Sequence, residues 1–139
     1  MNEIRLFEYL HPDSAAIRRT VFMEEQGFSN EFDETDGKAI HLVLYKNGKA
    51  AATARMFTEN SGKSYHLGRI AVLKEYRGMH LGAEIVTAMC EKARQLGAEK
   101  CELSAQCRVK EFYKALGFTE VGEIYYDEFC PHIYMEELL

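Results

Sequence analysis

Two features that mark specialised classes of protein are missing from this sequence. No apolar run among its 139 residues approaches the roughly 20 residues that a membrane-spanning helix needs. No basic segment followed by an apolar one opens the chain, so we expect no signal peptide. These absences favour a cytoplasmic protein without a membrane partner, and the length fits one domain, residues 1–139.

Paired cysteines and a surplus of basic charge are missing as well. The 4 cysteines contain no CxxC pair, which argues against a zinc site of paired thiolates and against a disulfide framework. We therefore expect free thiols and no metal. A net charge of −5 argues against general nucleic-acid binding, which needs a basic surface to neutralise phosphates.

The most informative segment present is Arg77–Ala83, which lies between the apolar run Ile70–Val72 and an amphipathic segment that ends near Leu96. A strand, a turn with glycines and a helix start form a cradle for phosphate, because the first N–H groups of a helix have no partner within it. The segment is locally basic within an acidic protein, which suits one anionic ligand. We interpret it as the pyrophosphate site of a nucleotide.

Around this segment the sequence predicts one α/β unit with a mixed sheet. Asn47-Gly48 between two strand-like runs is a strong hairpin signal, and a second hairpin turns at residues 60–63. Asp13 or Ser14 is the expected cap of the first helix. The strands are expected at about 4–10, 40–45, 50–57, 65–72, 101–105, 119–126 and 132–138, and the helices at about 14–26, 81–96 and 109–116.

Residues 28–38 form an acidic, irregular segment with Glu31, Asp33, Glu34 and Asp36 close together. A solvated loop is the simpler interpretation. The alternative is a lid or an acceptor-side loop that favours a cationic substrate.

Several motifs together resemble the GNAT family of acyl-CoA-dependent N-acetyltransferases. They are Arg69–Val72, the Arg-Gly-x-x-x-Gly turn that starts at Arg77, and Phe112–Phe118. The resemblance implies the GNAT fold, a mixed α/β (α+β) sheet of about seven strands with about four helices, whose parallel strands splay at the cofactor site. Arg18–Gly27 and Glu128–Met135 further resemble the ElaA/YjcF-like branch, in which the acceptor is generally not established.

The resemblance implies acetyl-CoA as the co-substrate and a small-molecule or peptide amine as the acceptor. The N–H groups of the cradle would hold the pyrophosphate, and the backbone of Ile70–Val72 would pair with the pantetheine arm. Gln106 stands where many relatives carry an asparagine that bonds this arm. The implied cofactor-binding residues are Ile70, Ala71, Val72, Arg77, Gly78, Met79, His80, Leu81, Gly82, Ala83, Gln106 and Tyr113.

His80 departs from the family pattern, which usually has glycine at this position of the turn. The residue that starts a helix normally has a negative φ. We therefore expect a negative φ at His80, which would let its backbone N–H and its imidazole face a phosphate oxygen.

Family analogy makes Tyr113 the general acid that protonates the thiolate of CoA, although spacing alone would make it a core aromatic. The amine must also lose a proton before it attacks. Candidates for this base are Glu24, Glu25, His41, His66 and His132, with a water relay as a further option. We rank Glu25 and His132 as site residues without assigning either a firm role.

The leading prediction is an N-acetyltransferase that works by direct attack in a ternary complex, without a metal. A non-catalytic acyl-CoA sensor is one alternative. An acyl-homoserine-lactone synthase is another, because the segment Arg18–Phe22 resembles that class as well. A homodimer is the expected assembly.

Overall fold

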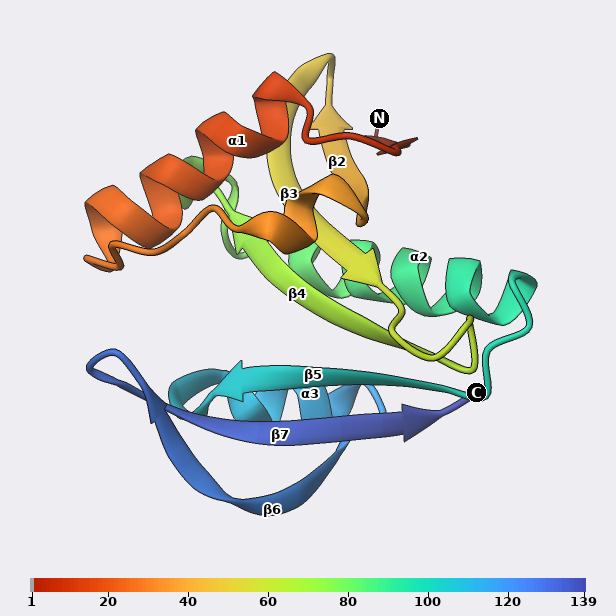
Figure 1. Ribbon diagram of the computed structural model, residues 1–139. Coiled ribbons are helices and arrows are strands. Elements are labelled where there is room, and N and C mark those ends of the chain that lie inside the picture. The colour runs from red at the N-terminus through yellow and green to blue at the C-terminus, as the bar shows by residue number, and fades with distance from the viewer. Residues whose placement is uncertain (1) are drawn as a thin grey trace.

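The structure is a computed structural model that describes residues 2–139. Its helices and strands follow one another as drawn in Figure 1. In chain order they are β1 (Asn2–Phe7), α1 (Pro12–Arg18), η1 (Arg19–Glu25), η2 (Glu34–Gly37), β2 (Ile40–Lys46), β3 (Lys49–Phe57), β4 (Ser64–Val72), η3 (Lys74–Tyr76), α2 (Leu81–Gln95), β5 (Lys100–Gln106), η4 (Cys107–Val109), α3 (Lys110–Ala115), β6 (Thr119–Asp127) and β7 (Cys130–Leu138).

All seven strands form one mixed sheet in the order β1-β2-β3-β4-β5-β7-β6. The only parallel neighbours in the described chain are β4 and β5, and they pair only from Ser64 with Lys100 to Leu67 with Leu103. Beyond this point the two strands diverge, which Figure 1 shows as a widening separation between β4 and β5. The predicted mixed sheet is therefore confirmed, and three α-helices accompany it.

The sheet buries a different core on each face. Leu42, Ala54 and Leu103 pack with α2 residues such as Ile85 and Met89 on one face. On the other face, Ala71 packs against residues of α1 and η1. The alternation along each strand thus holds the two helical layers on opposite sides. No helix within residues 2–139 is long and apolar enough to cross a membrane.

The first hairpin is confirmed. Asn47 and Gly48 have φ values of 53° and 82°, which a two-residue turn of type I′ requires. The first strand, by contrast, is shorter than predicted. It ends at Phe7, which pairs with His41 next to the start of β2, so the residues that follow Phe7 have no partner strand.

The first helix also differs from the prediction in its cap and its register. His11, rather than Asp13 or Ser14, is the N-cap, and its Nδ1 accepts a hydrogen bond from the N–H of Asp13 at 3.0 Å. From Arg19 the helix continues as a π-helix, η1. The wider turn of a π-helix rotates later residues away from the 3.6-residue spacing. Glu24, one of the candidate bases, is exposed.

The α2 helix ends one residue before the prediction. Leu96 is its C-cap and lies 44% exposed, whereas its spacing had placed it on the buried face. Gly97 follows with a φ of 85°, as expected for a glycine that ends a helix.

Candidate functional site

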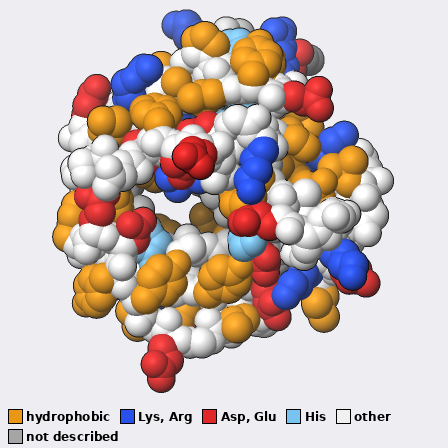
Figure 2. Space-filling view, in the orientation of Figure 1, with side chains coloured by type: hydrophobic (Ala, Val, Ile, Leu, Met, Phe, Trp, Pro, Cys, Tyr) orange, Lys and Arg blue, Asp and Glu red, His pale blue; other side chains and the backbone are white. Residues whose placement is uncertain are grey.

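The divergence of β4 and β5 opens the principal cavity of the described chain. It has a volume of about 1030 Å³ and is lined from both sides of the separation, by Gly68–Val72 of β4 and by Leu103, Ser104 and Gln106 of β5. Figure 2 shows this face of the molecule hollowed at the same place. A cavity of this size matches the range of small-ligand sites.

One end of the cavity is the turn that leads into α2. Gly78 has a φ of 83°, and His80, the N-cap of α2, has a φ of 63°. The expectation of a negative φ at His80 is wrong, because the chain reverses through two left-handed residues to enter the helix. A left-handed conformation strains a residue that carries a Cβ, so His80 stores strain where the family pattern has glycine.

The start of α2 supplies unused hydrogen-bond donors. The first helical bond runs from Glu84 N–H to His80 O at 3.1 Å, and no side chain within residues 2–139 caps the helix. The N–H groups of Leu81, Gly82 and Ala83 are consequently left for a ligand. Arg77 N–H is already used, because it donates to Lys74 O at 3.2 Å.

Gly82 keeps this cradle open. A Cβ at Gly82 would lie 3.3 Å from Cζ of Phe112 and 3.8 Å from Cγ2 of Val72, so a larger residue would fill the space in front of the N–H groups. Phe112, expected to face the core, lines the cavity instead and is 38% exposed. Met79 is 45% exposed and is absent from the cavity lining, unlike the other predicted cradle residues.

A β-bulge shapes the wall that β4 contributes. Thr53 pairs with Ala71 and Arg55 with Gly68, so two residues of β4 face one residue of β3, and Arg69 at the bulge has a φ of 51°. On its other edge β4 has no partner beyond Leu67 in the described chain. From Ile70 to Val72 the cavity-side edge of β4 therefore has no strand beside it, although the Val72 carbonyl oxygen accepts from Arg77 Nε at 3.0 Å.

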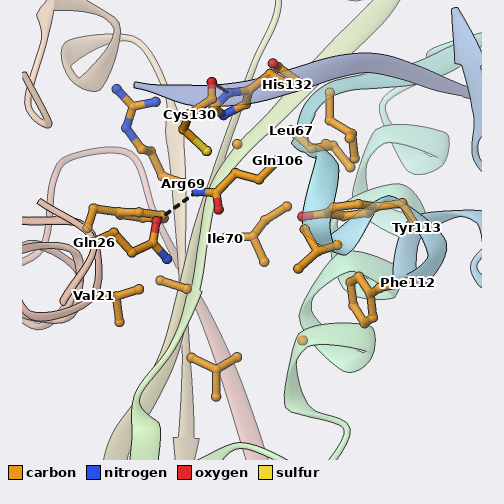
Figure 3. Close-up of a pocket in the computed structure, with 18 of the residues that line it drawn as sticks. Val21, Gln26, Leu67, Arg69, Ile70, Gln106, Phe112, Tyr113, Cys130 and His132 are labelled. Atoms are coloured by element: carbon orange, nitrogen blue, oxygen red, sulfur yellow. Dashed lines mark hydrogen bonds between the residues drawn. The ribbon is translucent and has the colours of Figure 1, made fainter. Parts of the chain in front are cut away.

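Tyr113 faces this wall from α3. Its side chain packs edge-on against Phe112 and Phe118, and only 8% of the residue is exposed. Figure 3 shows its hydroxyl pointing into the cavity towards Ile70. Burial raises the pKa of Tyr113 well above its usual value, so the phenol holds its proton at neutral pH.

Only some of the five candidate bases line the cavity. Glu25, His66 and His132 line the cavity, whereas Glu24 and His41 are absent from its lining. Glu25 lies at a distance of 2.6 Å from Arg77 Nη1, and the hydrogen bond from Arg77 lowers the pKa of Glu25. His41 is fully buried beside the Asp36 carbonyl oxygen, 2.9 Å from its Nε2, and burial lowers the pKa of His41.

Gln106 reaches across the cavity from the end of β5. Its Nε2 donates to Gln26 Oε1 at 2.8 Å, as the dashed line in Figure 3 shows. Its Oε1 accepts from Arg108 Nε at 2.9 Å. The amide therefore joins the end of η1 to β5 over the gap between the strands.

The acidic segment 28–38 contributes Glu31 to the cavity wall, and two of its carboxylates are buried although most of its residues are exposed. Glu31 and Asp36 are 5% and 7% exposed and bind the fully buried Arg18 at 2.7 Å each. Asp36 also binds Arg55 at 2.9 Å, and Arg69 lies 3.0 Å from Glu31. Cations from α1, β3 and β4 thus neutralise carboxylates that the sequence alone shows only as an acidic run. The sequence did not predict these buried salt bridges, because the partners are 13 to 38 residues apart in the chain.

A model of the acetyltransferase (GNAT) domain matches residues 11–139. The chain belongs to the GNAT acetyltransferase family. It is 36% identical over 125 residues to a predicted acetyltransferase of Bacillus subtilis, a match that covers 86% of this chain and 83% of that one. It is also 28% identical over 124 residues to the protein ElaA of Escherichia coli, covering 86% and 81% of the two chains.

Solved GNAT structures agree with this assignment. The crystal structure of Escherichia coli ElaA superposes with a TM-score of 0.86 at 25% identity and covers 99% of both chains. An aminoglycoside 6′-N-acetyltransferase complexed with coenzyme A shares the fold, with a TM-score of 0.78 at 14% identity over 98% and 96% of the two chains. The expected resemblance to the ElaA-like branch is confirmed.

GNAT proteins use acyl-CoA for transfer to amine acceptors, and this GNAT chain has a site that fits such a ligand. Three unused N–H groups at a helix start favour a phosphate group, and the space before Gly82 would be lost to any Cβ. The unpaired edge of β4 can bond the amides of an extended arm. The sequence motifs located these parts, whereas nothing local to Arg69 or Tyr134 signalled that both would line the same cavity.

Proposed function

We propose that this protein transfers an acetyl group from acetyl-CoA to a primary amine by direct attack in a ternary complex. The observation that carries the proposal is the convergence on one cavity of the α2 cradle, the unpaired edge of β4 and the hydroxyl of Tyr113. Residues 1–139 would act as one domain, in the cytoplasm and as a homodimer.

Each part of the cavity has a separate task in this proposal. The N–H groups of Leu81, Gly82 and Ala83 bind the pyrophosphate, and the β4 edge from Ile70 to Val72 orients the arm. Bound acetyl-CoA supplies an activated thioester carbonyl and a thiol leaving group. The cradle therefore fixes the distance at which the carbonyl meets the acceptor.

Tyr113 is the general acid in this proposal and donates a proton to the sulfur of the departing CoA. Its raised pKa keeps the proton in the resting enzyme, and its apolar surroundings, Phe112 and Phe118, exclude water from the transfer. Gln106, at the end of β5, would present its amide to the pantetheine arm in exchange for the bond to Gln26. His132, which lines the cavity beside Cys130, completes the wall around the reacting groups.

The test compares Tyr113→Phe with the exposed control Tyr126→Phe in a thiol-release assay with acetyl-CoA and a panel of primary amines. Tyr113→Phe should lower kcat by about 10²–10⁴-fold, the usual contribution of a general acid, and leave the Kd for acetyl-CoA within about twofold. Equal turnover of the two variants would remove Tyr113 from the acid role. Binding of acetyl-CoA without release for any amine would support the sensor alternative.

A further inference from the structure

Three side chains from neighbouring strands form a hydrogen-bonded chain beside the point where β4 and β5 diverge. His66 of β4 pairs in register with Glu102 of β5, one residue before the last parallel pair. His66 Nε2 lies 2.9 Å from Glu102 Oε1. Tyr134 Oη, from β7, lies 3.3 Å from His66 Nδ1. Both His66 and Tyr134 line the cavity, whereas Glu102 does not.

The partners of His66 determine which ring nitrogen carries the proton. A carboxylate only accepts hydrogen bonds, so Nε2 of neutral His66 carries the hydrogen that Glu102 accepts. Nδ1 then has a free lone pair, which accepts from the hydroxyl of Tyr134. The roles follow the order of a hydroxyl, an imidazole and an orienting carboxylate, and the first two of these residues line the cavity.

The residues around this hydrogen-bonded chain hold His66 and Glu102 in position for a proton that moves towards His66. Phe57 stacks on the His66 ring with centroids 5.0 Å apart, which fixes the ring plane. Glu102 also accepts from Ser64 Oγ at 3.3 Å, and its side chain is 12% exposed. A half-shielded carboxylate of this kind can compensate an imidazolium at short range.

The other titratable groups near this hydrogen-bonded chain include Tyr125 and Glu136, which both act on Tyr134. Lys100 Nζ lies 3.6 Å from Glu102 Oε2 on the side away from His66. Lys38 and Arg55 lie 5.3 Å and 5.8 Å from the centre of the Phe57 ring. Burial, followed by the charge of Glu102, raises the pKa of Tyr134 well above its usual value, so Tyr134 stays protonated as a relay.

The other two candidate bases in the cavity differ from His66 in their partners. Both carboxylate oxygens of Glu25 accept from Arg77, at 2.6 Å and 2.8 Å. Nδ1 of His132 lies 3.0 Å from Cys130 O, and its ring stacks on Tyr125. Neither group has an orienting carboxylate of its own in the described chain.

We propose that His66, oriented by Glu102 and reached through the hydroxyl of Tyr134, accepts the proton of the amine acceptor. This assignment rests on the proposed acetyl transfer. It makes His66 and Tyr134 catalytic residues and Glu102 a positioning residue.

The proton balance of the reaction is complete with these groups. The ammonium gives one proton to Tyr134 Oη while Tyr134 passes its own to His66 Nδ1, and Glu102 pairs with the resulting imidazolium. The nitrogen lone pair forms the C–N bond as the C–S bond breaks, and the sulfur takes the proton of Tyr113. The proton that the new amide nitrogen sheds replaces the one lost by Tyr113, and His66 releases its proton to solvent.

The experiment measures the pH dependence of kcat for wild type, His66→Gln, Tyr134→Phe and Glu102→Gln, using the best alkylamine acceptor of a panel. Glu99→Gln and Tyr126→Phe, both exposed, are the matched controls. His66→Gln should lower kcat at pH 7 by about 10²–10⁴-fold and leave the KM for acetyl-CoA unchanged. The loss in kcat should shrink towards pH 10, because a growing fraction of the acceptor is then deprotonated before it binds, which a merely structural role would not produce.

A second readout uses the ligand-free protein. Nitrogen chemical shifts of the imidazole should show the Nε2–H form of His66 in wild type and a mixture of tautomers in Glu102→Gln. Wild-type turnover in His66→Gln alongside an inactive Tyr113→Phe would overturn the relay and leave the proposed function standing. A wild-type protein that binds acetyl-CoA and acetylates no amine would overturn both.

Discussion

The buried guanidinium of Arg18 allows a sharp prediction about stability. Arg18 is fully buried, and its Nε and Nη1 donate to Glu31 and Asp36 at 2.7 Å each. A third bond runs from Nη2 to the carbonyl oxygen of Glu31 at 2.9 Å. In Arg18→Met the methionine fills much of the space, but two carboxylates lose their nearest cation.

Breaking a buried ion pair from one side costs about 3–5 kcal/mol. Because Arg55 and Arg69 still pair with Asp36 and Glu31, we expect Arg18→Met to lie at the lower end of this range. For a chain of 139 residues the entropy of unfolding at the midpoint is about 0.3 kcal/mol/K, so this range corresponds to a fall in Tm of about 10–17 °C. Urea denaturation followed by circular dichroism measures the free energy, and a thermal scan measures Tm.

The neighbouring residue provides a matched control. Arg19 is exposed, and its guanidinium lies over the face of Phe32 at 5.5 Å, so Arg19→Met should change the unfolding free energy by less than about 0.5 kcal/mol. A loss below about 1 kcal/mol in Arg18→Met, or an equal loss in both variants, would refute the reasoning about the buried pair.

The pH dependence of the free energy of unfolding tests the same prediction independently. Burial by itself raises the pKa of Asp36, but the hydrogen bonds and charges of Arg18 and Arg55 lower it from 3.8 to about 2. This carboxylate therefore contributes about 2 kcal/mol above pH 4, which is lost as the pH falls through about 2. Without Arg18 the pKa of Asp36 rises, so the difference between wild type and Arg18→Met should narrow between pH 7 and pH 3.

Three further predictions concern the cradle. His80→Gly should raise the free energy of unfolding by about 1 kcal/mol, because glycine adopts a φ of 63° without strain; lower stability in urea would show that the imidazole is needed for packing. Gly82→Trp should abolish acetyl-CoA binding in calorimetry, whereas Thr87→Trp on the exposed side of α2 should not, and equal affinities would contradict the cradle. Glu25→Gln should leave the acid limb of the pH–rate profile unchanged, because Arg77 lowers the pKa of Glu25; loss of that limb would return Glu25 to the base role.

Features that depend on neighbours along the chain could be predicted from the sequence. The Asn47-Gly48 turn and the strands that flank it follow from local backbone preference and alternation. The α2 helix follows from its apolar spacing and from Gly97. The cradle motifs also predicted the family, because their order and spacing reflect one continuous strand, turn and helix.

Features that depend on contacts between distant segments could not be predicted. His80 was expected to have a negative φ, yet the chain enters α2 through a left-handed turn that residue type does not reveal. Glu24 shares a helical spacing with Ile17 and Val21, but the π-helical segment η1 rotates it outwards. The segment 28–38 was expected to be a solvated loop, but Arg18, Arg55 and Arg69 form ion pairs with its carboxylates.

The sequence by itself determined the order of the elements and predicted the phosphate cradle and the role of Tyr113, since each depends on residues that lie close together in the chain. Only the tertiary structure decided which groups share the cavity. His66, Glu102 and Tyr134 come from three strands and meet because β5 pairs with β4 on one side and β7 on the other. Periodicity shows which face of a strand a side chain occupies, but strand order and register set what lies beside it.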